Sequence, residues 1–260
     1  MTDGFDRGAI ILVPPIGMAM GIFEALSRAL IERGRPIVSW ELGDVGGDRA
    51  TFYDHVSSYD EICGRIADAL NALCRGPCSA VSLCNGASIL AQIQRKALFE
   101  IDKSAIVGPY FHLANLDHNS IYEKTLMPLL AKAGEGSAAA AKMIHKILNS
   151  GQASISSRKD QVVKAHLVSP DSVLAYAQAL VGYRQRDELD LIGELRGKVA
   201  LFYCLDDEAV SHDYFLTIAE HLVEASRYIY RSGGHYAVFD DSELVADVVN
   251  FLIREEVYSG

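Results

Sequence analysis

The sequence predicts an α/β fold in which helices flank one mainly parallel β-sheet and a helical segment is inserted into the chain. Three observations predict it. Short runs of β-branched and aliphatic residues alternate with amphipathic stretches, a pattern typical of βα units around a sheet buried on both faces. The block 110–197 has helical periods and no strand signal. The chain has 260 residues, 50% of them hydrophobic, which is enough for one large core.

The strands are predicted from short apolar runs and the helices from apolar residues at helical spacing. Strands are expected at 9–13, 36–42, 78–83, 104–108, 198–207 and 227–231. Helices of the sheet-bearing part are expected at 21–34, 57–73, 86–99, 212–225 and 241–254. Gly34 ends the first helix, and a loop rich in Gly and Asp covers 44–51.

The block 110–197 is too long for a connection between two strands. Its helical periods lie at 121–134, 137–149 and 172–183, with polar loops between them. We therefore expect a helical cap at 110–197, inserted into an α/β core made of 1–109 and 198–260. The charged cluster Arg184, Arg186, Asp187 and Glu188 is most simply the solvated end of a cap helix.

The charge balance argues against a nucleic-acid partner. The formal net charge is −10, from 34 acidic and 24 basic residues, whereas proteins that bind phosphate backbones usually display a basic surface. The apolar run near the N-terminus ends at Pro14 and Pro15 and has no basic segment before it, which is not typical of a signal peptide. No apolar run reaches transmembrane length. We expect a cytoplasmic protein with no membrane partner.

The five cysteines are an odd number scattered through the chain, which favours reduced thiols over a disulfide framework. Cys74 and Cys78 are close in sequence, but no second pair of Cys or His at zinc-finger spacing accompanies them. We expect no metal and no cofactor. Four of the five cysteines are best interpreted as buried thiols.

Cys84 is the exception, because it stands where a strand turns into a helix. Ser82 and Gly86 lie two residues before and after it, and a nucleophile elbow needs small residues at these positions. Asp207 follows the strand after the cap, and His235 follows the last strand in a Gly-rich loop, so the chain order is nucleophile, acid, histidine. Two alternatives stay open: Asp206 could be the acid, and Cys84 could be a small buried residue at a strand end.

With these motifs the sequence resembles the α/β-hydrolase family over nearly its whole length. The stretch from Val13 to Leu30, VPPIGMAMGIFEALSRAL, is most similar to the thioesterase and acyltransferase branch; YDEICGRIADALNAL, CLDDEAV and GGHYAV are further family-like elements. The chain departs from the family pattern in having Ser82 for the first elbow glycine, a cysteine nucleophile, and Pro14-Pro15 for the common His-Gly. The first strand corresponds to the family's third, so the leading antiparallel hairpin is expected to be missing.

The resemblance implies a role for each candidate residue. Cys84 would attack as a thiolate, His235 would take its proton, and Asp207 would orient the imidazole. The backbone N–H groups of Asn85 and Ile16 would stabilise the oxyanion, since Pro14 and Pro15 have no N–H to donate. Three residues are expected to line the substrate pocket, namely Met18, Tyr110 and His112. For His112 and His118 a place on the surface is the alternative.

A cysteine nucleophile favours thioester donors. A thiol that attacks a thioester exchanges one such bond for another at nearly equal free energy, whereas attack on an oxygen ester runs uphill. The leading hypothesis is therefore acyl transfer or thioester cleavage through an acyl-S-cysteine intermediate. The donor would be a CoA or acyl-carrier-protein thioester, and the setting specialised-metabolite biosynthesis. The alternatives are a cysteine-dependent ester or lactone hydrolase similar to dienelactone hydrolase, and a non-catalytic binding protein with a hydrolase fold.

Overall fold

Six parallel strands form the centre of the molecule. The computed structural model describes residues 8–40, 59–114, 116, 120, 124–149 and 158–254. Every pairing between the described strands is parallel, and their order in the sheet is β2-β1-β3-β4-β5-β6. The strands are β1 (Ile10–Val13), β2 (Ile37–Ser39), β3 (Cys78–Leu83), β4 (Ile101–Val107), β5 (Lys198–Cys204) and β6 (Ser226–Tyr230).

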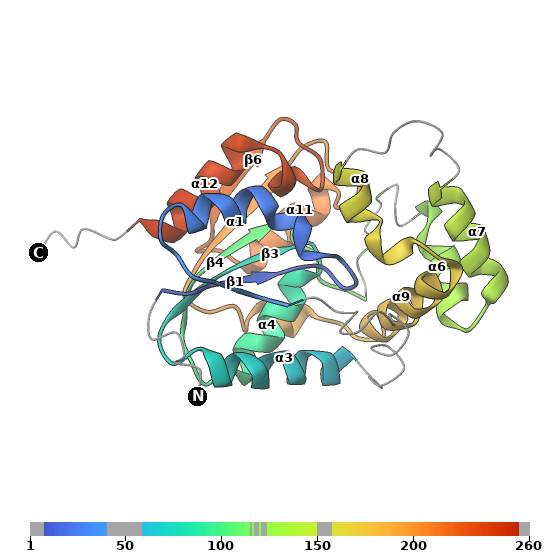
Figure 1. The fold of residues 1–260 in the computed structure, drawn as a ribbon, viewed down its shortest axis with the longest axis horizontal. Coiled ribbons are helices and arrows are strands. Elements are labelled where there is room, and N and C mark those ends of the chain that lie inside the picture. Colours follow the sequence, from blue (N-terminus) through green and yellow to red (C-terminus); the bar gives the residue numbers. More distant parts are fainter. Residues whose placement is uncertain are drawn as a thin grey trace, which may run out of the picture.

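Helices cover both faces of this sheet. Helices α1 (Glu24–Ile31) and α12 (Ser242–Ile253) lie on one face, and α3 (Tyr59–Leu73) and α4 (Gly86–Lys96) lie on the other (Figure 1). Side chains alternate along β1, so that Ile10 and Leu12 join the core under α1 and α12 while Ile11 and Val13 join the core under α3 and α4. Helix α11 (His212–His221) contributes to the second of these cores.

The segment between β4 and β5 forms only helices in its described residues. We call residues 110–197 the cap segment. Its helices are α6 (Met127–Gly134), α7 (Ala138–Asn149), α8 (Arg158–Val163), the 3-10 turn η2 (Ala165–Leu167), α9 (Pro170–Tyr183) and α10 (Leu189–Ile192). Helix α9 packs on α6 and α7, and these three helices stand to one side of the sheet in Figure 1. Helix α9 starts at a capping box in which the side chains of Ser169 and Ser172 each bond the other residue's backbone N–H.

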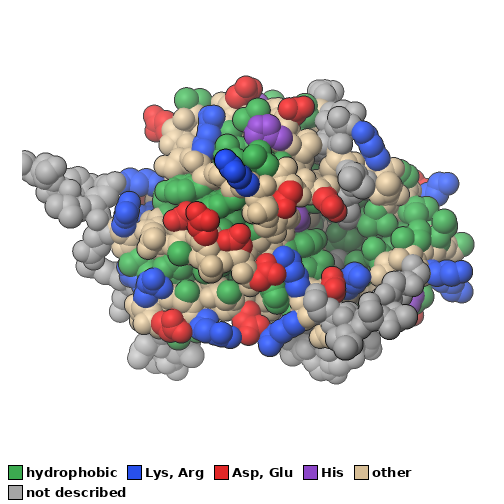
Figure 2. Space-filling view, turned by 90° about the horizontal axis from the view of Figure 1, so that it is seen from above, with side chains coloured by type: hydrophobic (Ala, Val, Ile, Leu, Met, Phe, Trp, Pro, Cys, Tyr) green, Lys and Arg blue, Asp and Glu red, His purple; other side chains and the backbone are tan. Residues whose placement is uncertain are grey.

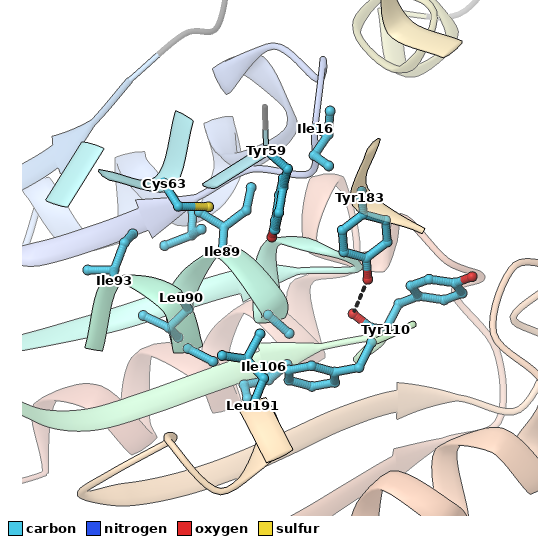
Figure 3. Packing of buried hydrophobic residues seen from close by; sticks show 14 of the residues in the cluster. Ile16, Tyr59, Cys63, Ile89, Leu90, Ile93, Ile106, Tyr110, Tyr183 and Leu191 are labelled. Carbon is cyan, nitrogen blue, oxygen red and sulfur yellow. Dashed lines mark hydrogen bonds between the residues drawn. The ribbon is translucent and has the colours of Figure 1, made fainter. Parts of the chain in front are cut away.

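Tyrosines attach the cap segment to the core. In Figure 3, Tyr183 at the end of α9 lies between Tyr59 of α3 and Tyr110, which follows β4. The rings of Tyr59 and Tyr183 meet edge-on with centroids 5.2 Å apart, and the Tyr183 hydroxyl donates to the carbonyl of Tyr110 at 3.5 Å. Aromatic contacts of this kind stabilise a packed interface beyond the area that they bury. The cap helices are therefore held against the sheet-bearing part near the start of α3.

The strands and helices expected from the sequence are present, with shifted ends. Residues Met20–Phe23 form a 3-10 turn, η1, before α1 begins. Helix α4 ends at Lys96 rather than at residue 99, because Ala97 is extended and the N–H of Leu98 donates to the side chain of Asn71. Strand β4 starts at Ile101 rather than 104. The expected loop 44–51, together with parts of two expected elements, falls in 41–58, outside the described residues.

Strand order places a crevice at one edge of the sheet. The chain adds β2 on one side of β1 and β3 on the other, so the strand order reverses between β1 and β3. In open α/β sheets, the crevice at the carboxyl ends of such strands is the usual ligand site. The segments that leave β1 and β3 there contain Ile16 and Cys84. None of the described helices has both the length and the apolar surface needed to cross a bilayer.

Candidate active site

Cys84 occupies a strained turn between β3 and α4. Its φ is +52°, and it is the one residue other than glycine with a positive φ in the described part of the chain. Such backbone costs of order 1–3 kcal/mol and is often found at functional sites. A Cβ on Gly86 would lie 2.5 Å from the carbonyl oxygen of Val13, so the start of α4 approaches β1 too closely for any side chain there. This is the geometry of a nucleophile elbow.

The carboxylate of Asp207 and the imidazole of His235 are hydrogen-bonded. The Nδ1 atom of His235 is 2.8 Å from Oδ2 and 3.1 Å from Oδ1 of Asp207. The backbone N–H groups of Ala209 and Val210 donate to Oδ1 of Asp207, each at 2.8 Å, and hold the carboxylate in place. Asp206 accepts instead from the N–H groups of the glycines before His235. Of the two candidate acids, Asp207 contacts the imidazole and Asp206 supports its loop.

His235 and Cys84 line the same cavity, and the thiol lies close enough to influence the pKa of the imidazole. Burial by itself lowers the pKa of His235, but the charges of Asp207 and Cys84 and the hydrogen bond to Asp207 raise that pKa well above its ordinary value. The site is therefore suited to hold the imidazole in its protonated form. A thiol, an imidazole and a carboxylate from three distant parts of the chain thus come together at one site.

Gly108 belongs to this site, although the sequence analysis missed it. Its φ is +51°, and a Cβ there would lie 3.2 Å from both Asp207 Oδ2 and His235 Nδ1. The residue follows β4 directly, and only a side chain as small as hydrogen leaves room for the pair. A glycine at the end of a buried strand, before Pro109, is the one signal that could have indicated a close approach.

The structure differs from expectation at Ile16. The backbone N–H of Ile16 donates to the side-chain Oδ1 of Asn85 at 3.0 Å, so this donor is already occupied. The reason is the close packing of α4 on the loop after β1, which places the Asn85 amide beside Ile16. The backbone N–H of Asn85 has no acceptor among the described residues. It is the expected oxyanion donor that the structure leaves open.

A cavity of about 430 Å³ opens beside Cys84 and His235. Met18 and Tyr110 line it, as expected. Most of its wall is apolar and comes from the cap segment, including Leu126, Met127, Leu130, Ile144, Leu148, Leu167 and Leu180. Figure 2 shows this side of the molecule hollowed next to the hydrophobic surface of the cap helices. The site can therefore take an apolar group with its reactive end at the sulfur.

His112 does not line this cavity, contrary to expectation. Its N–H donates to Glu188 Oε2 at 2.9 Å, and its carbonyl accepts from the N–H of Glu188 at 2.8 Å. These bonds join the two ends of the cap segment, and so they draw His112 away from the pocket. His118, the other candidate of this kind, lies outside the described residues.

The charged residues around Glu188 in the sequence predicted a solvated helix end, but the structure shows Glu188 buried. It is only 3% exposed, and its carboxylate accepts a hydrogen bond from the hydroxyl of Ser88 on α4. Burial raises the pKa of Glu188 to about 7, against the opposing effect of the hydrogen bonds from the Ser88 hydroxyl and the His112 N–H. The described residues contain no group of three His, Cys, Asp or Glu side chains arranged to hold a metal ion.

Comparisons with known proteins identify the fold. No model of a known protein family matches the chain, and no curated protein matches it either. Among solved structures, an esterase from Exiguobacterium antarcticum matches with a TM-score of 0.71 at 13% identity, covering 95% of this chain and 92% of that one. A hydrolase from Oleispira antarctica matches with a TM-score of 0.69 at 12% identity, covering 97% and 93%.

An α/β-hydrolase-fold protein from Burkholderia ambifaria matches with a TM-score of 0.64 at 15% identity, covering 95% of this chain and 91% of that one. At such identities the likeness is one of fold. It extends over almost the entire length of each protein and agrees with the parallel sheet and the helices on both of its faces. The chain has the α/β-hydrolase fold.

Proposed function

We propose that this protein is an acyl-transfer enzyme, a thioesterase or an acyltransferase that works through an acyl-S-cysteine intermediate on Cys84. One observation carries the proposal. Cys84, on its strained turn, lines an apolar cavity together with His235, whose imidazole is hydrogen-bonded to Asp207. A binding protein requires none of these three side chains in this order.

The reaction has two halves. His235 accepts the Cys84 proton, and the thiolate attacks the carbonyl carbon of a thioester to form a tetrahedral intermediate. The bond from that carbon to the donor sulfur then breaks, and the donor thiol leaves with the proton from His235. In the second half His235 takes a proton from the acceptor, which attacks the acyl-enzyme and releases Cys84. Asp207 orients and charge-stabilises the imidazole throughout.

The thiol nucleophile and the apolar cavity support a thioester of an apolar acyl chain as the donor. Exchange of one thioester bond for another is nearly neutral in free energy, and the acyl-S-enzyme stays reactive towards water, alcohols or amines. The apolar wall of cap-segment side chains makes much of the cavity unfavourable for water, which would favour transfer over hydrolysis. We propose CoA or an acyl-carrier protein as the carrier, and specialised biosynthesis as the setting.

A second candidate function is the hydrolysis of esters or lactones by the same cysteine. The structural neighbours favour it, since they include the esterase and the hydrolase described above. The two candidates share the acyl-enzyme and differ in the donor bond that forms it.

Intact-mass spectrometry tests both. The protein is incubated with acyl thioesters of several chain lengths and with matching phenyl esters. We expect an acyl adduct on Cys84 that is absent from Cys84→Ala and retained by Cys63→Ala, which removes a buried thiol elsewhere. Turnover of esters without thioesters favours the second candidate. A protein that forms no adduct and cleaves neither class of substrate contradicts both.

A further inference from the structure

The side chain of Asn85 is held in one orientation at the site. A backbone N–H can only donate, so the atom of Asn85 that faces the N–H of Ile16 at 3.0 Å is the oxygen Oδ1. The Nδ2 amide group then points to the other side. Ile16 is 2% exposed and Asn85 is 6% exposed, so the hydrogen bond between them is shielded from solvent.

The Nδ2 group of Asn85 has no hydrogen-bond partner among the described residues. It is not one of the fully enclosed polar atoms, and Asn85 lines the cavity together with Cys84 and His235. A donor in a mostly buried position without a partner is unfavourable by about 1–3 kcal/mol, unless water or a ligand satisfies it. The amide therefore presents donor hydrogens to the space where a substrate would react.

We propose that the side-chain amide of Asn85 is an oxyanion donor, which acts through Nδ2 in place of the Ile16 backbone N–H. The proposal rests on the acyl chemistry proposed above. In the tetrahedral intermediate the former carbonyl oxygen carries negative charge, and Asn85 supplies two donors to it, its backbone N–H and its Nδ2. The hydrogen bond from Ile16 to Oδ1 polarises the amide and strengthens the Nδ2 donor.

The opposite role for the Asn85 side chain would be to block the N–H of Ile16. If Oδ1 merely blocked the Ile16 N–H, removal of the side chain would free that donor, and stabilisation of the oxyanion would improve. The two roles thus predict changes of opposite sign when Asn85 is truncated. Asn85 lines the cavity and its Nδ2 has no partner among the described residues, which favours the donor role.

Three measurements on Asn85→Ala, Asn85→Asp and the wild-type protein separate these roles. The first is the rate of acylation by a thioester. The second is the affinity for an alkyl trifluoromethyl ketone, observed by fluorine NMR; the Cys84 thiolate adds to its carbonyl carbon and the oxygen becomes the oxyanion. The third is the rate at which iodoacetamide alkylates Cys84. This displacement forms no oxyanion, so its rate depends only on the reactivity of the Cys84 thiolate and on the access of the reagent to the sulfur. Gln92→Ala, which removes another buried amide on α4, is the control.

We expect Asn85→Ala to lower both the acylation rate and the ketone affinity about 100-fold, the usual effect of losing one oxyanion donor. Alkylation should stay within about twofold, and Gln92→Ala should match the wild type. Asn85→Asp keeps an acceptor for Ile16 but loses the donor, so it should lose ketone affinity even if Asn85→Ala does not fold. Equal or tighter ketone binding by Asn85→Ala overturns the proposal, as does a wild-type protein that forms no ketone adduct. A protein that binds the ketone through Asn85 but is not acylated by thioesters keeps this proposal and contradicts the proposed function.

Discussion

His235 Nδ1 and Asp207 Oδ2 are 2.8 Å apart, although 28 residues separate them in the chain. Their loops leave neighbouring strands, β5 and β6, at the same edge of the sheet. The Asp207 carboxylate accepts a hydrogen bond from the Nδ1–H group of His235. The other ring nitrogen, Nε2, is therefore the one that can exchange a proton with Cys84. The hydrogen bond to Asp207 thus fixes both the tautomer and the direction of the imidazole.

Asp207→Asn should lower the rate of acylation by about 10³- to 10⁴-fold. An amide at this position can donate to the imidazole and favours the wrong tautomer, which is the cause of a loss of this size in hydrolytic triads. The pKa of His235 should fall, because a charge that raises it is gone. Single-turnover acylation kinetics and a histidine NMR titration measure the two effects. Asp206→Asn weakens only the hydrogen bonds to the two glycines before His235, so it should lower the acylation rate much less. Equal losses of acylation rate in the two variants would contradict the assigned roles.

The fold and the order of the site residues could be predicted because their signals are local. The strand 78–83, the turn at Cys84 and the helix from Gly86 follow one another in the sequence. Each is set by apolar spacing or by the need for small side chains. Asp207 and His235 each follow a strong strand, and parallel strands bring such positions to one edge. The core and the Asp207–His235 pair therefore follow from patterns within about ten residues.

The features that were missed depend on contacts between distant segments. The N–H of Ile16 is occupied because α4 packs closely on the loop after β1, which only the folded backbone shows. Glu188 has charged neighbours in the sequence, yet it is buried because Ser88, 100 residues away, bonds its carboxylate. The same carboxylate accepts from the N–H of His112, which does not line the cavity. No spacing along the chain reports such contacts.

Gly108→Ala should reduce activity at least tenfold and also destabilise the fold. The new Cβ would lie 3.2 Å from both Asp207 Oδ2 and His235 Nδ1 and would push the pair apart, while the positive φ adds strain of about 1–3 kcal/mol. Gly136→Ala is the matched control, since Gly136 also has a positive φ but no atom within 4 Å of its Cβ position. Acylation rates and urea unfolding separate the effects. If both variants lost activity equally, strain alone would explain the loss.

Leu148→Trp should shorten the acyl chains that the protein accepts. Leu148 is a partly buried residue of α7 that lines the cavity, so a larger ring at this position reduces the space in which an acyl chain can lie. Acylation by long-chain thioesters should fall at least tenfold relative to acetyl thioesters. Met143→Trp changes an exposed side chain of the same helix and should leave the chain-length profile unchanged. An unaltered profile for Leu148→Trp would place the acyl chain elsewhere.

Glu188 should make the stability of the protein fall as pH rises. Burial raises its pKa from 4.5 to about 7, so the folded state binds a proton that the unfolded chain has released. The free energy of unfolding is therefore highest below about pH 4.5, as far as this group is concerned, and declines between pH 4.5 and 7. A shift of this size corresponds to roughly 3 kcal/mol. The raised pKa of His235 acts in the same direction from pH 6.5 upwards, so a mutant must isolate the Glu188 contribution.

Glu188→Gln provides that isolation, because an amide stays neutral at every pH. Its oxygen can still accept from the His112 N–H, and its Nε2 group can donate to the hydroxyl oxygen of Ser88. Its unfolding free energy, measured in urea, should change less between pH 5 and pH 8 than that of the wild type. At pH 8, where the wild type must bury a carboxylate, the variant should be the more stable of the two. Glu194→Gln removes a more exposed carboxyl of the same segment and should keep the wild-type slope. Parallel pH profiles for Glu188→Gln and the wild type would show that this carboxylate is already ionised without cost. The junction of the cap segment with α4 would then owe its stability to the tyrosine contacts instead.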